Sequence, residues 1–131
     1  TRFDGSVVRI EIPADRLFDT GQASLVPGAP AVLSMAAGEI ERVYPGHYVG
    51  IEGHLDASPL QGDGQLTPHA LSAARAEAVL TFLAERTPLN DNQLFLVAHG
   101  SNHPVVSNAT AAGRERNRRI ELVIYQELAP R

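Results

Sequence analysis

Segments with the periodicity of a strand alternate along this chain with segments that have the periodicity of a helix. Apolar and charged residues alternate over 8–12, and Pro13 then favours the end of a strand. Further strands are predicted at 48–54, 94–98 and 120–124, and helices at about 30–44, 68–86 and 110–117. Because strands separated by helices favour layered folds, we expect the helices to pack on a sheet.

The helix predicted over 68–86 has the clearest beginning. Thr67 is suited to the N-cap and Pro68 to the first helical position, where a missing N–H removes no hydrogen bond. Its packed stripe is expected to contain Leu71, Ala74, Ala78 and Phe82. The run over 94–98 is continuously apolar, which is typical of a central strand buried on both faces. Loops are expected at 14–26 and 57–68, and a tail at 126–131.

The composition is that of one domain with a single hydrophobic core. The chain has 131 residues, of which 44% are hydrophobic. The absence of cysteine excludes a disulfide framework and a thiolate zinc site. A net charge of −4, with four Phe, three Tyr and no Trp, argues against nucleic-acid binding.

The ends of the chain suggest a piece of a longer protein. The first residue is Thr1 rather than methionine, and the sequence shows neither a signal peptide nor the roughly 20 apolar residues of a membrane span. We therefore expect residues 1–131 to form one domain, with a core over about 7–125, cut from a membrane-anchored protein. Contact with the membrane would be made only by the missing parts of that protein.

Asp56 and Arg75 are the two charged residues most suggestive of a binding site. Asp56 follows a predicted strand, at the edge of a sheet where side chains commonly reach a crevice. Arg75 lies about one turn into a helix on the side of Leu71 and Ala78, where an unpaired charge is costly to bury. One alternative is an internal Asp56–Arg75 salt bridge. In the other, Asp56 binds the ammonium and Arg75 the carboxylate of a zwitterionic ligand.

Four segments together resemble the OmpA-like peptidoglycan-binding domain family over about residues 7–125. Each segment alone is weakly specific, but all four occur in the family's order and at similar spacing. They are Phe18-Asp19, Gly53-His54-Leu55-Asp56, Leu71-Ser72-Ala73-Ala74-Arg75-Ala76, and the run over 108–121 that contains Gly113-Arg114 and Asn117-Arg118-Arg119-Ile120-Glu121.

The resemblance implies an α/β (α+β) sandwich with β-α-β-α-β order, in which helices pack on a mixed four-stranded sheet. It also implies non-covalent binding of peptidoglycan in the bacterial periplasm, with no cofactor, metal or enzymatic activity. In the family, the matching aspartate and arginine bind the free amino-acid end of meso-diaminopimelate. The residues that the resemblance places in this pocket are Asp56, Arg75, Asp19, Thr20, Leu71, Asn117 and Arg118.

The loop before the second helix narrows the resemblance. Pro59, three residues after Asp56, is similar to the pattern of MotB-type flagellar stator proteins and of type VI secretion anchors. The chain departs from this pattern at Leu55, where the family has threonine, and at residues 67–70, where stators have Ser-Asn-Trp-Glu. These departures motivate an alternative of another class, a homodimerisation module of the same fold with weak or lost wall binding.

Other clusters offer weaker alternatives. The arginines at 114, 116, 118 and 119 could bind phosphate or nucleic acid, but a helix would point them in different directions, which favours separate structural roles. Of the five histidines, His54 and His99 could join Asp56 in a metal site of a hydrolase, although no metal-binding motif supports it. His54 is otherwise expected to bond to the backbone at the sheet edge. No Gly-x-Ser-x-Gly motif or other nucleophile constellation indicates an enzyme.

Overall fold

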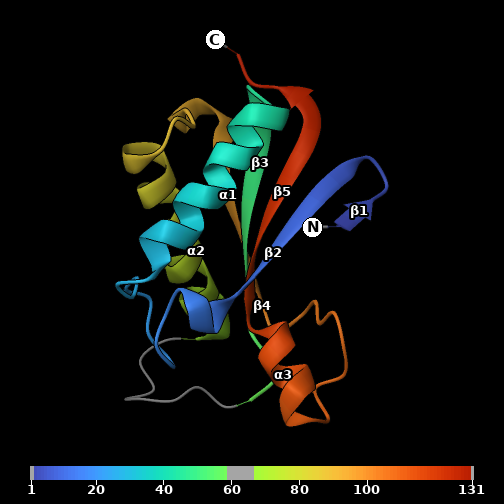
Figure 1. Cartoon of the computed structure of the whole chain (residues 1–131). Helices are drawn as coiled ribbons and strands as arrows, with labels where there is room; N and C mark the ends of the chain where they lie inside the picture. Colours follow the sequence, from blue (N-terminus) through green and yellow to red (C-terminus); the bar gives the residue numbers. More distant parts are fainter. Residues whose placement is uncertain (1, 59–66, 131) are drawn as a thin grey trace.

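The computed structural model describes residues 2–58 and 67–130 and contains one sheet with two long helices beside it (Figure 1). Short 3-10 helices lie at Ala14–Arg16 and Asp91–Gln93. Most of the loop expected at 57–68, including Pro59, lies outside the described residues. Within the described residues, no helix is both long enough and apolar enough for a bilayer crossing. In chain order, the strands and α-helices are β1 (Arg2–Asp4), β2 (Val7–Pro13), α1 (Ala29–Val43), β3 (His47–His54), α2 (Pro68–Arg86), β4 (Leu94–Gly100), α3 (Ala111–Asn117) and β5 (Arg119–Leu128).

The strands lie in the order β1-β2-β5-β3-β4. β3 and β4 are parallel, and the other neighbouring strands are antiparallel. Parallel strands need a long crossover, which α2 supplies between β3 and β4. The four longer strands form the predicted mixed four-stranded sheet. The three-residue β1 adds a fifth strand at its edge that the periodicity did not predict.

The hydrophobic core lies between the sheet and the two long helices. α1 and α2 lie on the same side of the sheet, whereas α3 lies beyond its end (Figure 1). Each fully buried Val, Leu or Ile contributes about 1.5–3 kcal/mol relative to exposure. Residues of the core cluster with no more than 1% exposure include Leu33, Ala37 and Ile40 of α1, Val49 and Ile51 of β3, Ala76, Val79 and Leu83 of α2, and Ile120 and Leu122 of β5.

The packed stripe of α2 lies one position later than predicted. Ala74, Ala78 and Phe82 are only half-buried. The deeply buried positions after Leu71 are Ser72, Arg75, Ala76, Val79 and Leu83. The stripe was displaced in the prediction because alanines occupy both flanks of this helix, so periodicity alone does not locate the centre of its buried face.

β4 is an edge strand, so the prediction of a central strand buried on both faces is wrong. Phe95 and Leu96 are 37% and 39% exposed. The strand is covered mainly by α2 on one side, and on the other Phe95 packs against the rings of Tyr48 and Tyr125. The apolar side chains of β4 are therefore covered by one helix and by a cluster of aromatic rings, and not by a helix layer on each face.

β5 is longer than the sequence pattern indicates. Residues 126–128, expected to begin a tail, continue the strand, and Leu128 pairs with His47 at the start of β3. Polar side chains at Gln126 and Glu127 concealed this extension, because they are exposed although their backbone remains in the strand. The sheet is consequently built around a ten-residue strand that borders both β2 and β3.

Candidate functional site

Asp56 lies two residues beyond β3 and is only 8% exposed. Its Oδ2 accepts a hydrogen bond of 2.6 Å from Nη1 of Arg118, and its Oδ1 accepts one of 3.0 Å from the backbone N–H of Ser58. Nη2 of Arg118 also lies 3.7 Å from the carboxylate of Asp15. The carboxylate of Asp56 is therefore paired with Arg118, and the alternative of an internal Asp56–Arg75 salt bridge is wrong.

Arg75 lies on the buried side of α2 and is 4% exposed. Its Nε donates to the backbone carbonyl of Gln22 at 2.7 Å, and its Nη2 donates to that of Asp19 at 3.2 Å. The guanidinium carbon lies 5.0 Å from the centre of the Phe18 ring, within the range of a cation–π contact. Within the described part of the chain, Nη1 makes no hydrogen bond and no carboxylate lies within 4.0 Å of this guanidinium.

The charges of Asp15, Asp56 and Arg118 all act on the guanidinium of Arg75. Burial lowers the pKa of the Arg75 guanidinium below its ordinary value, and the positive charge of Arg118 acts in the same direction. The charges of Asp15 and Asp56 oppose this effect, so both carboxylates act on Arg75 without forming a direct ion pair with it. A buried cation held by two carbonyls and a ring is incompletely compensated, because burying a charge is costly without a paired counter-ion.

The ends of β3, β4 and α2 are fixed to one another around this charged group. Gly53 of β3 lies directly against the backbone of Ser72 in the first turns of α2. Ser72 Oγ donates to the carbonyl of His69 at 3.1 Å and accepts from the N–H of Gly100 at 3.0 Å. Leu55 N–H donates to the carbonyl of Gly100 at 2.7 Å. Asp56 and Arg75 are thus positioned by regular elements rather than by independent loops.

The remaining predicted pocket residues occupy different environments. Asp19 and Thr20 are exposed in the segment held by Arg75, and Leu71 is 3% exposed. Asn117 is fully buried, and its side-chain amide forms hydrogen bonds with the loop over 105–108. Its Oδ1 accepts from the N–H groups of Val105 and Val106, and its Nδ2 donates to Val106 O and Asn108 Oδ1. Asn117 therefore shapes the loop beside the site.

The four arginines at 114, 116, 118 and 119 have separate partners and do not form one basic patch. Arg114 donates to the carbonyl of Asn108, and Arg116 lies 3.8 Å from Glu11. Arg118 bonds to Asp56, and Arg119 donates to Glu121 at 2.5 Å. The interpretation of this run as a set of structural arginines is in agreement with these contacts.

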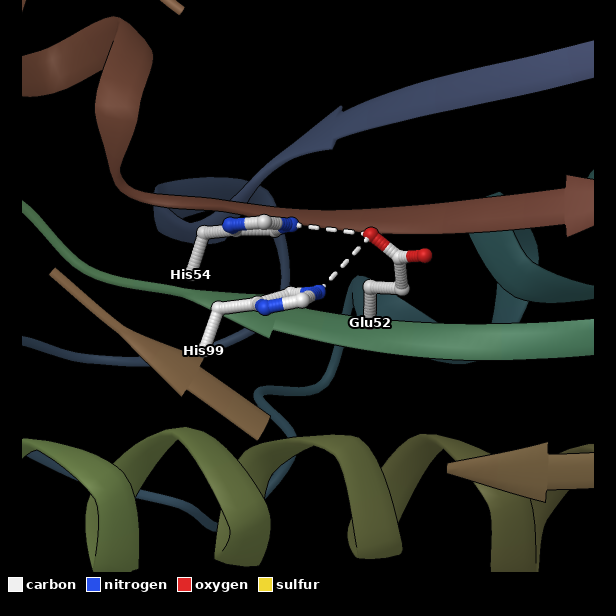
Figure 2. Close-up of side chains that lie close together, drawn as sticks. All are labelled: Glu52, His54 and His99. Carbon is white, nitrogen blue, oxygen red and sulfur yellow. Dashed lines mark hydrogen bonds and ion pairs between the residues drawn. The ribbon is translucent and has the colours of Figure 1, made fainter. Parts of the chain in front are cut away.

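A second polar cluster lies on the sheet face opposite α2 and contains Glu52, His54 and His99 (Figure 2). Nε2 of His54 and Nε2 of His99 lie 3.2 Å and 3.3 Å from the same carboxylate atom, Oε1 of Glu52. Two predictions are corrected here. His54 bonds to a side chain rather than to the backbone, and the carboxylate beside the two histidines is that of Glu52, because Asp56 turns toward Arg118.

The carboxylate of Glu52 remains ionised over a wide pH range. Burial alone would raise its pKa, but the hydrogen bond with His54 and the charge of Arg9, together with His99, lower the pKa of Glu52 to about 2. Burial lowers the pKa of His99, and the neighbouring His54 adds to this effect against the opposing charge of Glu52. Arg9 Nη1 lies 3.2 Å from both Glu52 Oε1 and Glu121 Oε1, which links the two buried carboxylates.

Two contributors to these clusters were not identified from the sequence. Gln22 contacts Arg75 only through its backbone carbonyl, so its residue type carries no signal. Glu52 precedes His54 by two positions, and this spacing places two residues of a strand on the same face. The sequence could therefore have placed Glu52 beside His54.

Comparison with known proteins places the fold among cell-envelope domains. The cell wall anchor of the T6SS from Pseudomonas aeruginosa has a TM-score of 0.82 and 29% identity, covering 92% of this chain and 82% of that one. A putative MotB like protein from Desulfovibrio vulgaris has a TM-score of 0.87 and 26% identity, covering 96% and 80%. These similarities confirm the predicted α+β sandwich with helices on a mixed sheet.

The sequence comparisons agree with the structural ones. The peptidoglycan-binding protein ArfA of Mycobacterium tuberculosis (strain ATCC 25618 / H37Rv) is 35% identical over 107 residues, which is 82% of this chain and 31% of ArfA. The chain thus spans about a third of that curated relative. A model of the OmpA family matches residues 17–118. Because this match covers most of the sequence and includes the first three recognised segments and residues 108–118 of the fourth, the chain belongs to the OmpA family.

Proposed function

We propose that this domain binds peptidoglycan non-covalently through the meso-diaminopimelate of its peptide stem and anchors a larger membrane-attached protein to the cell wall. Arg75 would bind the carboxylate at the free end of diaminopimelate, and Asp56 would bind the ammonium on the same carbon. No covalent bond is made or broken in this role.

The observation that carries this proposal is the state of Arg75. Its guanidinium is nearly buried, its Nη1 is not used by another described residue, and the nearest carboxylates act on it without contact. A ligand carboxylate would supply the missing counter-ion, and a charge-assisted hydrogen bond in a partly desolvated site is strong. Asp56 retains acceptor capacity beside its bonds from Arg118 and Ser58, since a carboxylate has about four acceptor positions.

The relatives support the same ligand and location. ArfA is named for peptidoglycan binding, and the Pseudomonas structure is described as a cell wall anchor. We infer that this chain is likewise a periplasmic domain of a bacterial envelope protein, whether a flagellar stator, a type VI secretion anchor or another wall-attached protein. The share of ArfA that it spans is consistent with a domain of a longer chain.

The two departures from the family pattern serve packing and helix initiation. Leu55 is 5% exposed, so its side chain fills the protein interior where a threonine hydroxyl would need a partner. Thr67 accepts a hydrogen bond of 3.1 Å from Ala70 N–H as the N-cap of α2, with Pro68 at the first position, as predicted. Both changes leave the charged groups of Asp56 and Arg75 in place, which favours retained wall binding.

Replacing Asp56 with asparagine tests the ammonium-binding half of this proposal. The variant keeps the size of the side chain and an acceptor for Arg118 but removes the negative charge. We expect the unmodified domain to sediment with purified diaminopimelate-type sacculi, and Asp56→Asn to lose at least about tenfold in apparent affinity. Asp91→Asn is the matched control, because Asp91 is exposed in the 3-10 helix before β4, at the opposite end of that strand.

Circular dichroism of each variant separates lost binding from lost folding. Sedimentation of folded Asp56→Asn at the level of the unmodified domain would refute a role for this carboxylate. If the unmodified domain itself stays in the supernatant and is dimeric by analytical ultracentrifugation, the alternative of a dimerisation module is correct instead.

A further inference from the structure

A cluster unrelated to the Asp56–Arg75 site contains side chains that are common metal ligands. Glu52 and His54 lie two positions apart in β3, and His99 lies on the neighbouring strand β4, all on the face opposite α2 (Figure 2). Glu52 is 6% exposed and His54 is 4% exposed. Two adjacent strands therefore fix all three side chains, which limits the entropy lost on binding an ion.

Two of the three distances between the ligand atoms are close to those of a tetrahedral coordination sphere. The two Nε2 atoms lie 3.2 Å and 3.3 Å from Glu52 Oε1, and one ligand atom from each residue lies within 4.8 Å of the others. The two imidazole rings are stacked, with centroids 4.6 Å apart and planes at 19°. In a tetrahedral zinc site with bonds of about 2.0–2.2 Å, neighbouring ligand atoms are about 3.3–3.6 Å apart.

We propose that Glu52, His54 and His99 bind a divalent transition-metal ion, with Zn²⁺ as the ion best suited to two imidazoles and one carboxylate. This ligand set has the softness that favours zinc over magnesium or calcium, which prefer oxygen ligands. The role is metal binding, and the structure assigns no reaction to it.

Metal binding would replace the two hydrogen bonds that the histidines donate to Oε1 of Glu52 with coordination bonds. Without metal, both histidines approach Oε1 of Glu52 through Nε2, so each donates its Nε2 proton to that atom. Metal binding at Nε2 requires the proton to move to Nδ1 of the same neutral ring. Nδ1 of His54 is buried and has no hydrogen-bond partner among the described residues, so no existing bond at this atom opposes the exchange.

The neighbouring charges can also accommodate the ion. Arg9 Nη1 lies near Glu52 but equally near Glu121, so it keeps a carboxylate contact if Glu52 turns toward the metal. Glu121 is further held by Arg119. The cluster opens into a cavity of about 320 Å³, which His103 also lines. The ring of His103 lies 4.5 Å from that of His99, so this cavity has room for a fourth ligand from solvent or from His103.

Titration of the chelator-treated 131-residue domain with ZnSO₄ by isothermal calorimetry tests the site. We expect one zinc ion per chain and no comparable binding of Mg²⁺. His99→Gln and Glu52→Gln should each weaken zinc binding about 10- to 100-fold or more, since changes even to residues behind the ligands have effects of that size. Co²⁺ should give the intense visible absorption of a tetrahedral site, which His99→Gln removes.

His69→Gln is the matched control, because His69 is an exposed histidine outside this cluster, near Gly100. His99 lies on an edge strand and is partly exposed, so its variant keeps the test valid if Glu52→Gln fails to fold. The proposal is overturned if the domain binds no zinc, or if His99→Gln binds it as well as His69→Gln does. The measurement contains no peptidoglycan, so its outcome is independent of wall binding.

Discussion

Replacing Arg75 with alanine is expected to weaken binding of a diaminopimelate-containing muropeptide by about 2–5 kcal/mol, or roughly 30- to 5,000-fold. The change removes the only described cation that is nearly buried without an ion-pair partner within 4.0 Å. In the variant, Asp56 could still bind the ammonium of the ligand, but the ligand carboxylate would have no counter-ion. Isothermal calorimetry with the purified muropeptide measures the loss directly.

The control variants separate binding from folding at this position. Arg75 also holds the segment over 19–22 through two backbone carbonyls, so Arg75→Ala should lower the unfolding free energy as well. Arg75→Lys keeps the positive charge but loses the planar fork, and it should bind with intermediate affinity. Arg86→Ala removes an exposed arginine from the last turn of the same helix and should bind normally. A folded Arg75→Ala variant with unchanged affinity would contradict the assigned role.

Gly53→Ala is expected to destabilise the domain by about 3 kcal/mol or more, a large effect for the addition of one methyl group. A Cβ at this position would lie 2.2 Å from the backbone O of Ser72 and 2.9 Å from its backbone carbon. These are main-chain atoms of α2, so the clash can be relieved only by moving the helix away from β3. The shift would also disturb the relative positions of Asp56 and Arg75.

Gly38→Ala provides the opposite expectation from the same substitution. Gly38 lies inside α1, and a Cβ there would meet no atom within 4 Å. Alanine is about 0.5–1 kcal/mol more favourable than glycine in a helix interior, so this variant should be more stable than the unmodified domain. Urea denaturation of the two variants checks the comparison. Equal stabilities would show that the close approach of β3 and α2 does not constrain residue 53.

The elements predicted best from the sequence are those defined by local chemistry. The start of α2 follows from Thr67 and Pro68, whose cap and restricted backbone act within one turn. The strand β3 follows from a run whose alternate residues face the core. By contrast, the apolar run of β4 fits an edge strand as well as a central one, because residue type reports burial but not strand order.

The candidate site shows the same division between local and distant information. The motifs placed Asp56 and Arg75 correctly relative to the strand and the helix, but they did not predict which groups these two side chains bond to. Asp56 bonds to Arg118, sixty-two positions away, and Arg75 to carbonyls in a loop more than fifty positions earlier. Such pairings depend on how three strands and a helix come together. The polar side chain of Asn117 gave no indication that this residue is fully buried at the end of α3, where its amide bonds to the loop over 105–108.

The most direct test of the central claim compares two muropeptides that differ in one group. Lysine has the carbon chain and terminal amine of diaminopimelate but lacks the carboxylate at that end, which is the group assigned to Arg75. Calorimetry with the unmodified domain should show binding of the diaminopimelate peptide and at least about tenfold weaker binding of the lysine peptide. Equal affinity for the two peptides would contradict the proposal that Arg75 recognises this carboxylate.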